Sequence, residues 1–69
     1  MGAFRRVLVH RKVIVNLFDG SSISGVLYSD PGNLIVLKNA VYLEPGTEPV
    51  ELDGDTVIER DKVLFVQAP

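Results

Sequence analysis

Turn-forming residues divide this sequence into short segments, and their spacing limits the fold more than any other feature. Asp19 and Gly20 form a dipeptide that favours a two-residue β-hairpin turn. Residues 30–33 (Asp-Pro-Gly-Asn) and 44–49 (Glu-Pro-Gly-Thr-Glu-Pro) are also typical of turns and loops. In the segments between them apolar residues alternate with polar ones, as in half-buried strands. Five antiparallel strands are therefore expected, at residues 13–17, 22–29, 34–43, 50–60 and 62–67.

Glycines inside two of these segments indicate that the sheet is strongly bent. Gly25 lies on the same face of its strand as Ile23 and Leu27, where a missing side chain marks a bend, a bulge or a close backbone approach. Gly54 offers a second bend. The run Leu-Ile-Val-Leu at residues 34–37 is apolar on both faces, so we expect it to be covered on both sides. The fold class predicted is all-β, a small, partly open, five-stranded barrel.

The chain has no cysteine and a single histidine, His10. These counts exclude a disulfide framework, zinc or iron–sulfur ligation and a cysteine nucleophile. The serines have only His10 as a general base, and no neighbouring carboxylate in the sequence orients it. The pair Asp53 and Asp55 is too small for a calcium site. We expect no catalytic residue, no metal ligand and no cofactor.

At 69 residues the chain is expected to form one domain, with a basic N-terminal element at 1–12 and the barrel at 13–66. The N-terminal element contains Arg5, Arg6, Arg11 and Lys12 and no acid, whereas the rest of the chain has three basic and nine acidic residues. Nucleic acid should therefore be attracted to this element and repelled elsewhere. Residues 3–12 fit either a strand or a short helix.

We expect a soluble protein in the cytoplasm of a bacterial host cell, or in a virus particle. The longest apolar run is too short to span a bilayer. The N-terminus also lacks the pattern of a secretory signal, because its basic residues bracket only three apolar residues at 7–9.

Two separated patterns resemble the motifs of the Sm and Sm-like family. Leu17, Gly20, Gly25 and Leu27, followed by Asp30 and Asn33, resemble the first motif, and residues 58–66 (Ile-Glu-Arg-Asp-Lys-Val-Leu-Phe-Val) resemble the second. The compact chain is also similar to short Sm-like proteins encoded by bacteriophages of actinobacteria. The resemblance implies a helix followed by five strands and other phage proteins as partners.

The same resemblance implies a ring of about five to seven copies, in which the fourth strand of one copy pairs with the fifth strand of the next. The sequence independently favours self-association, because a short apolar fifth strand left unpaired would promote aggregation and the core of so small a chain is limited. The residues expected in the interface are Val57, Ile58, Val63, Leu64, Phe65 and Val66.

RNA binding, the usual task of the family, is only partly implied. Asn33 matches the asparagine of the family's base pocket. Pro31 stands at the stacking position and has no π face, and Glu59 stands where an arginine is usual, with Arg60 in place of the following glycine. We therefore predict a non-enzymatic ring that acts as a structural or interaction module. The alternatives are an RNA-binding ring and a phage protein that captures a host factor. Weak RNA binding is expected at Asn33, Arg60, Arg5, Arg6, Arg11 and Lys12.

Overall fold

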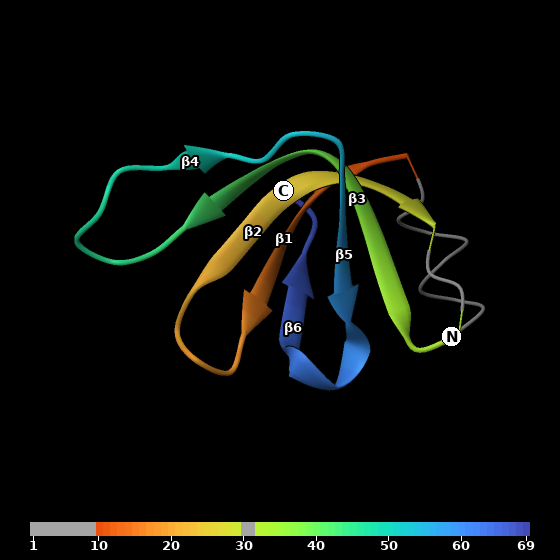
Figure 1. The fold of residues 1–69 in the computed structure, drawn as a ribbon. Coiled ribbons are helices and arrows are strands. Elements are labelled where there is room, and N and C mark those ends of the chain that lie inside the picture. Colours follow the sequence, from red (N-terminus) through yellow and green to blue (C-terminus); the bar gives the residue numbers. More distant parts are fainter. Residues whose placement is uncertain (1–9, 30–31) are drawn as a thin grey trace.

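A computed structural model describes residues 10–29 and 32–69 of the protein (Figure 1). All pairings between its strands are antiparallel, which confirms the all-β prediction. Residues 1–9, where the sequence fits a helix or a strand, lie outside the described part. No helix in the described ranges is long and apolar enough to cross a membrane. The elements are β1 (Lys12–Leu17), β2 (Ser22–Ser29), β3 (Leu34–Leu43), β4 (Val50–Glu51), β5 (Asp55–Glu59), the 3-10 turn η1 (Arg60–Lys62) and β6 (Val63–Gln67).

The predicted fourth strand is divided into β4 and β5, which is a departure from the sequence-based expectation. Asn39 in the middle of β3 has a positive φ of 53°, and β3 is strongly bent along its length (Figure 1). β4 pairs with β3 on one side of this point and β5 pairs with it on the other. Between them Gly54 adopts a φ of 71°. A single straight strand could not pair along the whole of the bent β3. Residues 50–59 therefore pair with β3 in two separate strands, β4 and β5.

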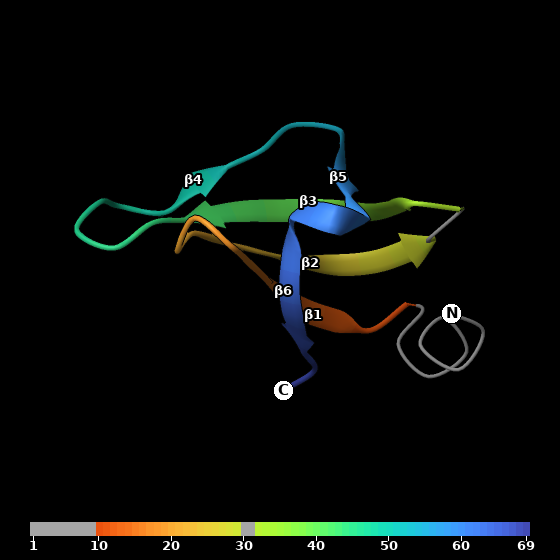
Figure 2. The ribbon, with the colours of Figure 1, turned by 90° about the horizontal axis from the view of Figure 1, so that it is seen from below.

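The strands form one curled sheet in the order β4-β3-β2-β1-β6, and β5 also pairs with β3. Figure 2 shows the consequence of the curl, since β6 runs across the direction of β3. The turn η1 joins β5 to β6, which lie at the two ends of the curled sheet. Within the described residues, β5 pairs only with β3 and β6 pairs only with β1. We call the unpaired edges of β5 and β6 the open seam.

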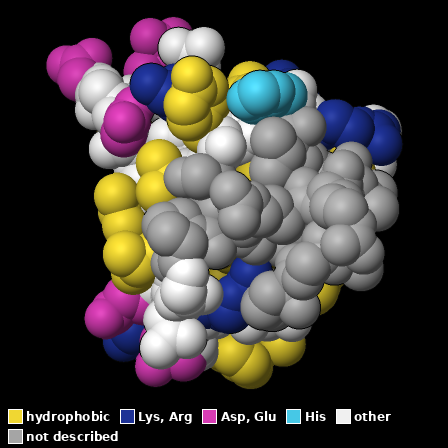
Figure 3. Space-filling model, turned by 90° about the vertical axis from the view of Figure 1, so that its right-hand side faces the viewer, with side chains coloured by type: hydrophobic (Ala, Val, Ile, Leu, Met, Phe, Trp, Pro, Cys, Tyr) yellow, Lys and Arg dark blue, Asp and Glu magenta, His cyan; other side chains and the backbone are white. Residues whose placement is uncertain are grey.

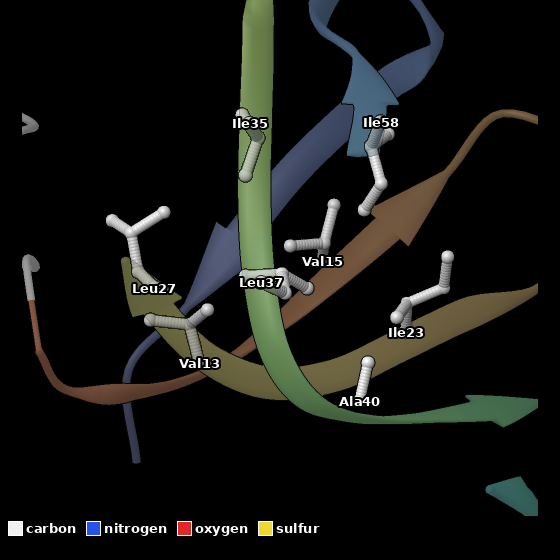
Figure 4. Packing of buried hydrophobic residues seen from close by; sticks show 8 residues of the cluster. All are labelled: Val13, Val15, Ile23, Leu27, Ile35, Leu37, Ala40 and Ile58. Atoms are coloured by element: carbon white, nitrogen blue, oxygen red, sulfur yellow. The ribbon is translucent and has the colours of Figure 1, made fainter. Parts of the chain in front are cut away.

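The core lies inside the curl and is built from alternate positions of the strands (Figure 4). Leu27, Ile35 and Leu37 are fully buried. The face predicted for Ile23 and Leu27 is thereby confirmed. The second face of the run at 34–37 is less covered than expected, because Leu34 is exposed and Val36 is only half-buried in the single chain. The core consists of Val13, Val15, Ile23, Leu27, Ile35, Leu37, Ala40 and Ile58.

β2 and β3 approach each other closely at Gly25. A Cβ atom at this position would lie 3.1 Å from the carbonyl oxygen of Lys38 and 3.2 Å from the Cα atom of Ala40. The register of β2 against β3 also shifts between Ser24 and Val26, beside this glycine. The expected close backbone approach is confirmed, and it allows the sheet to curl tightly around its core.

Asp19 holds the turn between β1 and β2. Its Oδ1 atom accepts hydrogen bonds from the backbone N–H of Ser21, at 2.9 Å, and from the Ser21 hydroxyl, at 2.5 Å. These bonds favour the ionised carboxylate, so they lower the pKa of Asp19 below its ordinary value of 3.8.

The variant Asp19→Asn keeps an acceptor oxygen in this turn and removes its ionisation. A group whose pKa is lowered by folding stabilises the protein above its unfolded-state pKa, and this contribution is lost as the pH falls through the folded-state pKa. We therefore expect the unchanged protein to be slightly more stable than the variant at neutral pH, with the difference disappearing in acid. Urea unfolding of both proteins over a series of pH values measures it. A difference that is the same at every pH would contradict this role of Asp19.

Candidate functional site

The loops that carry Asn33 and Arg60 come together at one end of the sheet. The backbone N–H of Arg60 donates a hydrogen bond to the carbonyl oxygen of Asn33 at 2.7 Å. Leu34 pairs with Glu59 directly beside it, because β3 and β5 are neighbours. These residues, with Asp61, line a pocket of about 300 Å³, which we call the loop pocket. The two sequence motifs, 25 or more positions apart at these residues, therefore form one site.

The charges of the loop pocket are mixed, with two carboxylates and one guanidinium. Glu59 and Asp61 are exposed and Arg60 is half-buried. The excess of one negative charge disfavours a phosphate group in the pocket. The hydrogen-bonding groups of Asn33 and the acidic side chains could instead contact a neutral base. Pro31, the residue at the family's stacking position, lies outside the described residues.

A second candidate surface is apolar and follows the open seam. Val57 on β5 is 56% exposed, and Phe65 on β6 is 50% exposed. Phe18, in the turn after β1, is also exposed, and it lines with Leu17 and Val57 an open cavity of about 640 Å³. Exposed apolar side chains beside unpaired strand edges are the features that strand pairing with another chain would cover.

The residues predicted for the oligomer interface differ in their accessibility. Val57, Leu64 and Phe65 are exposed and available to another chain. Val63 and Val66 are half-buried and pack against the core. Ile58 belongs to the core, with 6% of its surface exposed, and it also lines the open cavity beside Val57, so its place in the interface stays a prediction. Its neighbour Val57 points outwards because successive residues of a strand alternate between the two faces.

Of the basic residues predicted to bind nucleic acid, Arg11 and Lys12 are exposed beside the start of β1. One Arg11 amino group donates to the carbonyl oxygen of Pro69 at 3.4 Å. Arg5 and Arg6 lie outside the described residues. His10, Tyr28 and Lys38 contact one another through the register of the strands, and this group was not predicted from the sequence. In Figure 3 the imidazole of His10, the chain's single histidine, lies among hydrophobic and basic side chains.

Within residues 10–29 and 32–69, no three His, Asp or Glu side chains are placed to hold one metal ion. Ser21 is buried and donates its hydroxyl hydrogen bond to Asp19. The ring of His10 contacts the ring of Tyr28. Ser21 and His10 therefore contact Asp19 and Tyr28, respectively, and not each other.

The curled antiparallel sheet, its glycine-dependent bend and the joined motif loops define the Sm-like fold. Solved structures of archaeal Sm proteins share it. The chain is similar to the SmAP1 heptamer of Pyrobaculum aerophilum, with a TM-score of 0.85 and 26% identity over 100% of this chain and 92% of that chain. It is similar to a second heptameric archaeal Sm protein, with a TM-score of 0.84 and 26% identity over 99% and 98% of the two chains.

A third similar structure is the Sm protein of Pyrococcus abyssii in complex with a uridine heptamer. Its TM-score is 0.82, and it is 25% identical over 93% of this chain and 90% of that chain. No protein-family model and no curated protein matches the chain in sequence. The sequence-based prediction of an Sm-like fold is confirmed by these structural similarities.

Proposed function

We propose that this protein is a non-enzymatic Sm-like protein that assembles into a homo-oligomeric ring and acts as an interaction module. The observation that carries the proposal is the open seam, whose two strand edges carry the exposed Val57, Leu64 and Phe65. The edge of β5 in one copy would pair with the edge of β6 in the next copy. Such a head-to-tail contact closes into a ring when the rotation between copies allows it.

Two further points support assembly. The chain is so short that its own core supplies limited stability, and burial between copies would add to it. Two of the similar archaeal structures are heptamers. Light scattering and native mass spectrometry test the proposal directly, and the expected mass is several times that of the 7.6 kDa chain. A cooperatively folded monomer at micromolar concentration would overturn it.

A second candidate function is RNA binding at the loop pocket. The hydrogen bond from Arg60 to Asn33 brings the two motif loops together, and the similar protein of Pyrococcus abyssii is bound to a uridine heptamer. Glu59 and Asp61 act against phosphate in this pocket. We expect weak, salt-sensitive binding of oligo-uridine by the unchanged protein.

The variant Glu59→Arg is expected to strengthen oligo-uridine binding on the order of tenfold. The change removes a repulsive anion from the loop pocket and supplies a cation, and one charged hydrogen bond has an effect of this size. Fluorescence anisotropy with a labelled oligomer measures it. The control is Glu44→Arg, which changes the net charge by the same amount. Glu44 is exposed and lies in the loop after β3. Equal gains from both variants would contradict a binding role for the pocket.

Two more specific roles were predicted: a component of a bacteriophage particle, and a phage protein that captures a host factor. Both stay predictions from the sequence, as do the cytoplasmic or virion location and the phage partners. The genes beside the coding sequence distinguish these roles, because virion genes favour the first and regulatory genes favour an RNA-binding ring.

A further inference from the structure

The chain contains two Asp-Gly dipeptides, Asp19-Gly20 in the turn between β1 and β2 and Asp53-Gly54 in the link between β4 and β5. Both glycines have a positive φ, 92° at Gly20 and 71° at Gly54. An Asp-Gly bond rearranges spontaneously more readily than other aspartyl bonds, because glycine has no side chain to keep its backbone nitrogen away from the aspartyl carboxyl group. The two sites are equal in their chemistry, so their surroundings determine which of them reacts.

The rearrangement passes through a cyclic imide. The backbone nitrogen of the glycine attacks Cγ of the neutral aspartic acid, a C–N bond forms, and the amide proton leaves with the carboxyl hydroxyl group as water. A second water molecule then opens the ring. Cleavage of the new bond restores aspartate, whereas cleavage of the original peptide bond gives isoaspartate, in which the main chain runs through Cβ and Cγ. Water is the only co-reactant, so the reaction requires no enzyme.

Asp19-Gly20 is restrained in the folded protein. The Oδ1 atom of Asp19 accepts hydrogen bonds from the backbone N–H and from the hydroxyl of Ser21. The N–H of Gly20 donates a hydrogen bond to the carbonyl oxygen of Leu17 at 3.2 Å. Attack by this nitrogen on Cγ would require these bonds to break. The lowered pKa of Asp19 also reduces the fraction of the neutral acid, which is the form that loses water.

Asp53-Gly54 has none of these restraints. Both residues are exposed, and with Asn39 they line an open pocket of about 340 Å³. Among the described residues, no hydrogen bond or ion pair engages the Asp53 carboxylate or the Gly54 amide. Figures 1 and 2 show the link between β4 and β5 at the periphery of the molecule, where water has access to it.

We propose that Asp53-Gly54 is a site of spontaneous modification, at which aspartate converts to isoaspartate in the folded protein, and that Asp19-Gly20 is protected from the same reaction. Isoaspartate adds one carbon atom to the main chain between β4 and β5. Two residue pairs join β4 to β3, whereas five join β5 to β3. The added atom should therefore disrupt the pairing of β4 and leave that of β5 intact.

The reaction also exposes a new α-carboxylate at this site. Carboxyl methyltransferases specific for isoaspartate recognise such a group, so the modified protein is expected to be a substrate for an enzyme of this class. The inference does not depend on ring formation or on RNA binding at the loop pocket.

Ageing of the full chain in heavy-oxygen water at physiological pH tests the proposal, because each opening of the ring inserts one labelled oxygen. Trypsin separates the two sites into the peptides 13–38 and 39–60. Mass spectrometry should find that peptide 39–60 gains label several-fold faster than peptide 13–38, with isoaspartate at position 53. In protein unfolded by urea the two peptides should gain label at similar rates, because the restraints on Asp19 are then lost.

Asp53→Glu is the matched control, because it keeps the charge but its longer side chain does not readily close the imide ring. This variant should lose the label and the isoaspartate of peptide 39–60. Ser21→Ala removes one hydrogen bond from Asp19 and should raise the labelling of peptide 13–38. Circular dichroism shows whether each variant keeps its fold. Amide hydrogen exchange of the aged protein should increase at β4 and stay unchanged at β5.

Equal labelling of the two peptides in the folded protein would overturn the proposal, as would a folded protein in which neither peptide gains label. Labelling of Asp53→Glu at the rate of the unchanged protein would place the reaction at another residue and would also overturn it. Unchanged hydrogen exchange at β4 in the isoaspartate form would contradict the expected loss of pairing.

Discussion

Val57→Lys is expected to convert the assembly into monomers of 7.6 kDa that keep their strands. Val57 is 56% exposed on the unpaired edge of β5, so lysine is tolerated there in a single chain. In a ring the same charge would be buried without a partner at every contact between copies. Such a burial costs several kcal/mol, and the cost recurs around the ring. Light scattering measures the mass, and circular dichroism measures the retained β structure.

The control is Thr47→Lys, in which lysine is introduced at an exposed position of the loop between β3 and β4, outside the open seam. This variant should keep the mass of the unchanged protein. Dissociation of both variants, or of neither, would contradict the proposed interface.

A mixing experiment distinguishes a head-to-tail contact from a symmetric one. Phe65→Lys blocks the edge of β6 and leaves that of β5 intact, whereas Val57→Lys does the reverse. If β5 pairs with β6, neither variant assembles alone, but an equal mixture forms dimers of about twice the chain mass through its one intact pair of edges. A mixture that remains monomeric, or a Phe65→Lys variant that assembles unaided, would exclude this pairing.

Gly25→Val is expected to abolish cooperative folding or to lower the free energy of unfolding by about 3 kcal/mol. The new Cβ would lie 3.1 Å from a backbone oxygen of β3 and 3.2 Å from the Cα atom of Ala40, and valine adds two methyl groups to this crowded position. The obstacle is backbone, so the side chain cannot avoid it by changing rotamer. A domain of this size has little stability to lose. Thermal unfolding followed by circular dichroism measures the loss.

Ser24→Val is the control for this prediction, because Ser24 is the adjacent, half-buried position on the outer face of β2. Valine favours a strand at such a position, so this variant should melt at or above the temperature of the unchanged protein. If Gly25→Val melted like Ser24→Val, the close approach of β2 and β3 would not limit the fold.

Local patterns were sufficient to predict much of the fold. The bounds of β2 and β3 and the buried face of Ile23 and Leu27 follow from alternation and turn chemistry. The bend at Gly54 was predicted, but the complete separation of β4 from β5 was not, because it also depends on the positive φ of Asn39 in a neighbouring strand. Pairing with β3 determines that break. Within residues 50–60 themselves, Gly54 is the residue that indicates a bend.

In the candidate sites too, local sequence patterns predicted some features, whereas others depend on pairing between strands. Asn33 and Arg60 were singled out together through the motif resemblance, and the structure places them in one pocket. The neighbourhood of Lys12 and Lys38 could not be predicted, because only the registers of β1, β2 and β3 bring the two lysines into one row across the sheet. The inward side chain of Ile58 and the outward side chain of Val57 follow from the alternation of β5.

The shortness of η1 has a geometric consequence for the proposed ring. Three residues, Arg60–Lys62, connect the strand that would contact one neighbour to the strand that would contact the other. The angle between these two edges fixes the rotation from copy to copy, and rings of six and seven differ by only about 9° in that rotation. A link this short leaves little freedom to vary the angle, so each ring should contain a single number of copies. Glycines inserted into η1 should then yield mixed or unclosed assemblies.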